Sequence, residues 1–101
     1  MNTPVDYVSA TTIRQKFNES AYALAIDRGE LKSTKLHESH LRNPSAQGRA
    51  YCTWSEIIRY FDHEGNIAVE VHQYIRQGII SGRPDPKRLR ERDRLLVVRR
   101  T

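Results

Sequence analysis

The chain has 101 residues, of which 38% are hydrophobic, with a single cysteine and a formal net charge of +5. This length suits one small domain, 1–101, and a single cysteine excludes an intrachain disulfide. No apolar run approaches the roughly 20 residues that a membrane span needs. Residues 1–6 also lack the features of a signal peptide, so we expect a cytoplasmic protein without a membrane partner.

The N-terminal third is predicted to contain one amphipathic helix. Residues 1–8 should form an extended lead-in, and Ser9 is a suitable N-cap because its hydroxyl can accept a free N–H of the first turn. Helical spacing predicts a helix over 10–28, which Gly29 then ends. Its hydrophobic stripe consists of Ile13, Phe17, Ala21 and Leu24.

The middle of the chain carries weaker signals. Leucines five residues apart fit neither the helical nor the strand period, so a short helix or strand near 31–41 is expected, followed by a loop over Asn43–Gly48. Residues 51–63 allow two interpretations. One is a helix started by the capping box at Thr53–Glu56. The other, which we favour, is a strand over Trp54–Asp62 that turns through Asp62–Asn66 into a hairpin.

Alternating side chains predict a strand over 67–75. One face would carry Ile67, Val69, Val71 and Ile75, with Gln73 as a polar break, and the other Ala68, Glu70, His72, Tyr74 and Arg76. Beyond it, Gly78, Gly82, Pro84 and Pro86 predict an irregular but ordered link. Residues 95–98 should form a short strand buried on both faces. The expected class is therefore α+β, an N-terminal amphipathic helix on a small antiparallel sheet with a Gly/Pro-rich, Arg-rich C-terminal link.

Positive charge is concentrated in the last quarter of the chain. Residues 1–75 hold 8 Lys/Arg and 9 Asp/Glu, whereas residues 76–101 hold 9 Lys/Arg and 3 Asp/Glu. Such asymmetry favours a polyanionic partner, so we expect this quarter to bind the backbone of RNA or DNA without chemistry. The interleaved Glu91 and Asp93 favour the alternative of an ordinary salt-bridged surface. The expected binding residues are Tyr74, Arg76, Arg83, Lys87, Arg88, Arg90, Arg92 and Arg94.

Two other functions are compatible with the same residues. A small metal-independent ribonuclease, similar in architecture to ribonuclease toxins, would use His72 with Arg83, Asp85 and Lys87. A protein-interaction module, an inhibitor or adaptor, would instead dock its basic link on an acidic partner. Because His37 and His40 form the only close pair and Cys52 has no cysteine partner, we expect no metal site and no cofactor.

Overall fold

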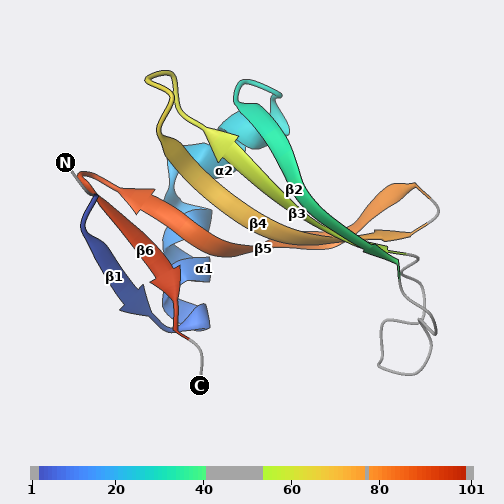
Figure 1. Ribbon diagram of the computed structural model, residues 1–101, viewed down its shortest axis with the longest axis horizontal. Coiled ribbons are helices and arrows are strands. Elements are labelled where there is room, and N and C mark those ends of the chain that lie inside the picture. Colours follow the sequence, from blue (N-terminus) through green and yellow to red (C-terminus); the bar gives the residue numbers. More distant parts are fainter. Residues whose placement is uncertain (1–2, 41–53, 77, 100–101) are drawn as a thin grey trace.

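A computed structural model describes residues 3–40, 54–76 and 78–99 of the chain. These residues form one six-stranded sheet with the strand order β1-β6-β5-β4-β3-β2, and two helices lie behind it in Figure 1. The elements are β1 (Val5–Val8), α1 (Ala10–Glu19), α2 (Ala21–Asp27), β2 (Lys32–His40), β3 (Trp54–Phe61), β4 (Ile67–Arg76), β5 (Ile79–Glu91) and β6 (Arg94–Val98). The α+β class fits this arrangement of helices on one sheet.

The sheet is mixed, whereas the sequence predicted an antiparallel one. The expected lead-in contains β1, which pairs parallel to β6 with Val5 opposite Leu95 and Val8 opposite Val98. Two further backbone bonds extend this pairing, from the N–H of Leu95 to the carbonyl of Pro4 at 2.8 Å and from the N–H of Arg99 to the carbonyl of Val8 at 2.7 Å. The first strand thus covers the backbone of the last one, which would otherwise be an open sheet edge.

The single predicted helix over 10–28 is two helices. Ser9 caps α1 as predicted, because its hydroxyl oxygen accepts a hydrogen bond of 3.1 Å from the backbone N–H of Thr12. Ser20 breaks the run, since its backbone is extended and its hydroxyl donates to the carbonyl of Phe17 at 2.7 Å. A serine side chain that bonds a nearby carbonyl competes with the helical ladder. Gly29, at φ 67°, follows the end of α2 as expected.

This break changes which side chains the helices bury. Ile13 and Phe17 of the predicted stripe belong to the core, but Ala21 is exposed and Leu24 is 52% exposed. The turn at Ser20 rotates α2, so that Tyr22, Ala23 and Ile26 pack against the core instead. The buried cluster joins α1 to β3, β4, β5 and β6 and consists of Ile13, Phe17, Ile58, Val69, Val71, Leu89 and Leu96.

The favoured hairpin over residues 54–75 is confirmed, and the capping-box helix is wrong. β3 pairs antiparallel with β4, and the connecting turn is closed by the Asp62 carboxylate. Its Oδ1 accepts hydrogen bonds from the backbone N–H groups of Glu64 and Asn66, each 2.9 Å long, and Gly65 adopts a φ of 83°. Aspartate stabilises such turns because its side chain satisfies the backbone donors that the turn exposes.

The predicted irregular link is instead most of β5, a strand of thirteen residues. Two features accommodate its prolines. β6 pairs with β5 only over Arg88–Glu91, so it does not reach the segment that carries Pro84 and Pro86. That segment pairs with β4 on one side and leaves its other side open. The β4–β5 register also shifts twice, between Glu70 and Val71 and between His72 and Tyr74. Proline is tolerated where a strand has an open side or a bulge.

The predicted short element near 31–41 is the edge strand β2, while the predicted loop at 43–48 lies outside the described residues. Leu95 and Leu96 are buried, as expected for the last apolar run, whereas Val97 and Val98 are half-buried. The longer of the two described helices, α1, has ten residues, and neither could cross a bilayer.

A buried carboxylate links three strands of the sheet. Glu56 of β3 lies 2.9 Å from Nζ of Lys35 in β2 and accepts a bond from Nε2 of Gln73 in β4 at 3.2 Å. The hydrogen bond from Lys35 lowers the pKa of Glu56, against the opposing effect of burial. The same bond raises the pKa of Lys35. The ionised form of Glu56 is therefore favoured in the folded state.

Glu56→Gln should make stability less dependent on acid pH. A carboxyl whose pKa is lowered on folding contributes stability above its unfolded pKa, and this is lost as the pH falls through the folded pKa. Urea unfolding near neutral pH and at about pH 3 measures this loss, which should be smaller in the variant than in the wild type. Glu64→Gln, at an exposed turn position, is the control and should keep the wild-type pH dependence. Equal pH dependence of the wild type and Glu56→Gln would contradict the assignment.

Candidate nucleic-acid interface on the helix-free face

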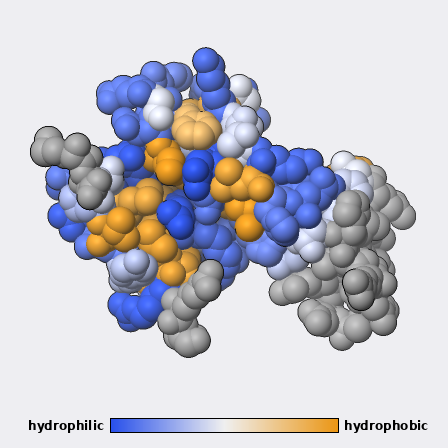
Figure 2. Space-filling view, in the orientation of Figure 1, coloured by the Kyte–Doolittle hydropathy of each residue, from blue (hydrophilic) through white to orange (hydrophobic). Residues whose placement is uncertain are grey.

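The sheet has a second face that no described helix covers. Side chains alternate along a strand, and Val69 and Val71 face the helices, so Glu70 and His72 project from the opposite side. We call this side the helix-free face, and it is turned toward the viewer in Figures 1 and 2. Figure 2 shows hydrophobic side chains over β1 and β6 and over the middle strands, with hydrophilic ones between them.

A hollow of about 360 Å³ lies on this face, and we call it the sheet hollow. It combines charged, titratable and apolar side chains from β3, β4, β5 and β6. Its lining residues are Ile57, Glu70, His72, Lys87, Arg88, Val97 and Val98. Its volume is within the range of about 300–1,000 Å³ that is typical of small-ligand pockets.

The strand register explains why these residues meet. Glu70 lies opposite Arg88, Arg88 opposite Val97 and His72 opposite Ile57. Between Glu70 and Val71 the pairing on β5 moves from Arg88 to Pro86, so Lys87 is the extra residue of a bulge. A bulge places two consecutive side chains against one partner. This is how Lys87 and Arg88, neighbours in sequence, both line the sheet hollow.

Glu70 holds two guanidinium groups beside the hollow. Nε and Nη2 of Arg59 both donate to its Oε1, at 3.0 and 2.9 Å. Nε of Arg88 lies 3.5 Å from its Oε2. Glu70 is only 8% exposed, and ion pairs to a guanidinium fix the orientation of both partners. The pairs therefore preorganise Arg59 and Arg88 on this face.

His72 and Tyr74 form an aromatic pair on the same strand. Their ring centroids are 4.9 Å apart with planes tilted by 33°. Asp85, in register with His72 on β5, lies 2.9 Å from Nζ of Lys87 and 3.5 Å from Nη2 of Arg14. The predicted ribonuclease residues His72 and Lys87 are thus together in the sheet hollow, with Asp85 beside them.

The other predicted binding residues lie elsewhere. Arg83 lines a different hollow of about 250 Å³ beside the helices, together with Phe17 and Asp27. Arg92 is in the β5–β6 turn, where its φ is 59°. The side chain of Arg76 lies outside the described part of the chain.

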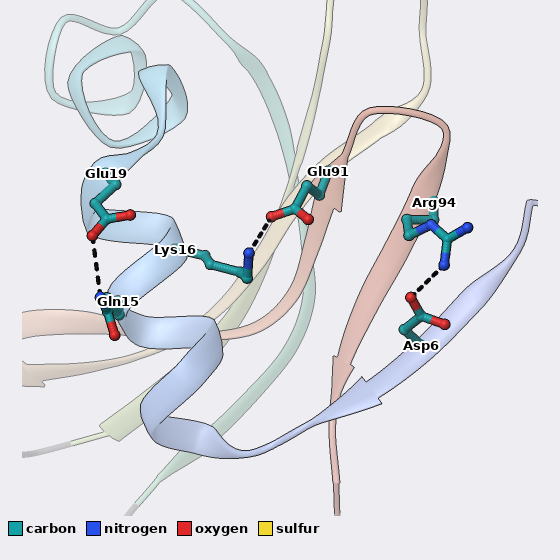
Figure 3. A network of polar contacts seen from close by, with 6 residues as sticks. All are labelled: Asp6, Gln15, Lys16, Glu19, Glu91 and Arg94. Carbon is teal, nitrogen blue, oxygen red and sulfur yellow. Dashed lines mark hydrogen bonds and ion pairs between the residues drawn. The ribbon is translucent and has the colours of Figure 1, made fainter.

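Ion pairs offset much of the C-terminal charge. Carboxylates from the first three quarters of the chain lie beside its arginines, as Asp6 does with Arg94 at 2.6 Å (Figure 3) and Asp62 with Arg90 at 4.0 Å. The hydrogen bond from Arg94 to Asp6 raises the pKa of the guanidinium. The figure also shows Lys16 bound to Glu91 at 2.8 Å. Folding therefore distributes the charge that the sequence concentrates. Lys87 and Arg88, which are paired with Asp85 and Glu70, lie beside the sheet hollow.

Metal ligands do not cluster among the described residues. No group of three or more His, Cys, Asp or Glu there could hold a metal ion, and Cys52 lies outside that part of the chain. His37 is on β2 and His63 is in the β3–β4 turn, on elements apart from His72. The sheet hollow itself offers one carboxylate, one imidazole and two cations.

No protein-family model, curated protein or solved structure matches the chain. The site is thus defined by its geometry, and sequence reasoning did not identify Ile57, Arg59, Val97 and Val98 as site residues. The hairpin signal could not have found Arg59, because counting back from the turn at Asp62–Asn66 pairs it with Val69. A register shift between Tyr60 and Phe61 places it opposite Glu70 instead. Opposite charges in that position stabilise a sheet.

Proposed function

We propose that the helix-free face binds single-stranded nucleic acid across the sheet hollow. The observation that supports this most is the meeting of two cations, an aromatic pair and an apolar wall on an uncovered sheet face. Lys87 and Arg88 are placed to contact phosphates, and Tyr74 with His72 offers a surface on which a base can stack. This combination is typical of proteins that bind single strands.

The dimensions of the site favour a single strand over a duplex. The sheet hollow has the volume of a small-ligand pocket, which an unstacked base and its sugar can enter. In a duplex the bases are paired and stacked inside, so rings on a protein surface cannot reach their faces. Single-stranded segments present those faces to aromatic side chains.

The ion pairs predict that few phosphates are neutralised. All four of the cations concerned have carboxylate partners, which a phosphate would have to displace or share: Lys87, Arg88, Arg90 and Arg94. Binding through Lys87 and Arg88 should therefore show a modest salt dependence. Each neutralised phosphate on a single strand contributes about −0.7 to the slope of log K against log salt.

Lys87→Gln and Arg88→Gln should each make that slope shallower, by about 0.7 for each phosphate that the variant no longer neutralises. Fluorescence anisotropy of labelled single-stranded RNA and DNA over a range of salt concentrations measures it. Arg92→Gln is the matched control, since it removes the same charge from the β5–β6 turn and should leave the slope unchanged. Tyr74→Ala should weaken binding by about 1–3 kcal/mol without changing the slope.

Two outcomes would contradict the proposal. One is the absence of binding at low salt. The other is an equal effect of Arg92→Gln and Arg88→Gln, which would mean that the general charge of the C-terminal quarter binds rather than the hollow.

A protein-interaction module is the second candidate, and one observation favours it. Ile79 is 72% and Ile80 50% exposed at the far end of the β4–β5 hairpin, which extends past the helices (Figure 1). Exposed apolar side chains at such a projecting site are typical of contacts between proteins. The same anisotropy titration separates the candidates, because this one requires no affinity for nucleic acid.

A further inference from the structure

The sheet hollow contains a carboxylate and an imidazole in addition to its cations. Glu70 and His72 are two residues apart on β4, so their side chains project from the same face with Cα atoms about 7 Å apart. Both line the hollow together with Lys87 and Arg88. The carboxylate holds Arg59 and Arg88 in place, and together with the imidazole it also supplies a base and an acid in the same space.

We propose that the sheet hollow cleaves single-stranded RNA by transfer of the phosphate to the 2′-oxygen. Glu70 accepts the proton of a 2′-hydroxyl, whose oxygen then bonds to the adjacent phosphorus. The bond from phosphorus to the 5′-oxygen breaks, and protonated His72 donates its proton to that oxygen. The products are a 2′,3′-cyclic phosphate and a 5′-hydroxyl, and the reaction consumes no water. This inference rests on the proposed binding of a single strand.

The chemistry of the two groups assigns their roles. A carboxylate oxygen accepts protons, which assigns the role of base to Glu70, whose oxygens lie beside Arg59 and Arg88. Histidine is the side chain that most often transfers protons in catalysis, which assigns the role of acid to His72. In an in-line displacement the attacking and leaving oxygens lie on opposite sides of the phosphorus. Two groups that flank the phosphate from one strand can reach one oxygen each.

Lys87 and Arg88 have a role in the same step. Negative charge accumulates on the non-bridging oxygens as the phosphorus becomes five-coordinate. Cations that are already oriented stabilise this charge without reorganisation, and the bulge and Glu70 orient these two. Arg59, held to Glu70 by two bonds, is a positioning residue for the base.

The test uses a randomised single-stranded RNA, incubated with the full chain in EDTA. Fragments ending in a 2′,3′-cyclic phosphate are expected, and the same sequence pool as DNA should be bound but not cut. His72→Gln and Glu70→Gln should each slow cleavage by about 10²–10⁴-fold, measured at protein concentrations that saturate the RNA because both residues also support binding. His63→Gln, purified in the same way, replaces an exposed histidine of the β3–β4 turn and should keep the wild-type rate.

The outcomes separate cleavage from binding. RNA that is bound by the wild type but left intact overturns cleavage and leaves the proposed function standing. RNA that is neither bound nor cut overturns both. Cleavage that survives His72→Gln also overturns the inference, because it then comes from another site or a contaminant. The melting temperature of each variant is measured. If Glu70→Gln melts at a lower temperature than the wild type, the test rests on His72→Gln alone. A wild-type rate that falls at both acid and alkaline pH is expected for one base and one acid.

Discussion

Phe17→Ala lowers the free energy of unfolding by about 3–5 kcal/mol, whereas Leu24→Ala leaves it almost unchanged. Phe17 is 6% exposed and lies in the cluster that joins α1 to the sheet, so its truncation removes apolar contacts and leaves a cavity. Leu24 is 52% exposed on α2 and belongs to no buried cluster of the described chain. Urea unfolding monitored by circular dichroism measures both variants.

The pair of variants also tests the helix break at Ser20. The stripe predicted from the sequence places Leu24 with Phe17 on one continuous helix, and both substitutions would then be costly. The free energy of unfolding of a small domain is only about 5–15 kcal/mol. A loss of about 3–5 kcal/mol in Phe17→Ala alone is therefore easily distinguished from a similar loss in both variants. Comparable destabilisation by Phe17→Ala and Leu24→Ala would contradict the rotation of α2.

Local signals in the sequence identify the elements whose structure depends on local chemistry. The cap at Ser9, the end at Gly29 and the hairpin around Asp62 each depend on bonds within a few residues. The break at Ser20 escapes prediction because Ala-rich flanking sequence favours helix and conceals a single competing serine. The strand β5 escapes it because prolines are unfavourable in a strand unless its neighbours leave a side open.

The candidate site could be predicted in part. The sequence identifies His72, Lys87 and Arg88 as chemical candidates, and alternation along 67–75 correctly places Glu70 on the face of His72. The ion pairs could not be predicted, because Asp6 and Arg94 are 88 residues apart and meet through the parallel pairing of β1 with β6. Charge counted along the sequence therefore overstates the charge that folding leaves near one surface.

Arg59→Met should destabilise the fold through the group that it leaves behind. Glu70 is 8% exposed, and its remaining cation, Arg88, lies at 3.5 Å. Removing one partner of a fully buried pair costs about 3–5 kcal/mol. Because the Arg59 side chain is 28% exposed, water reaches this pair and a loss of about 1–3 kcal/mol is expected. Urea unfolding near neutral pH measures it.

The double variant Arg59→Met/Glu70→Met completes the cycle. Since both charges are then replaced by apolar side chains of similar length, most of the lost stability should return. A double variant no more stable than Arg59→Met would contradict an energetic coupling between the two residues. The recovered fold also separates the two roles of Glu70. If the carboxylate only holds Arg59 and Arg88 in place, cleavage should fall no further than in Arg59→Met/Arg88→Gln, which lacks both of its partners. If it accepts the proton of the 2′-hydroxyl, the double variant should fold, bind RNA through Lys87 and Arg88, and fail to cut it.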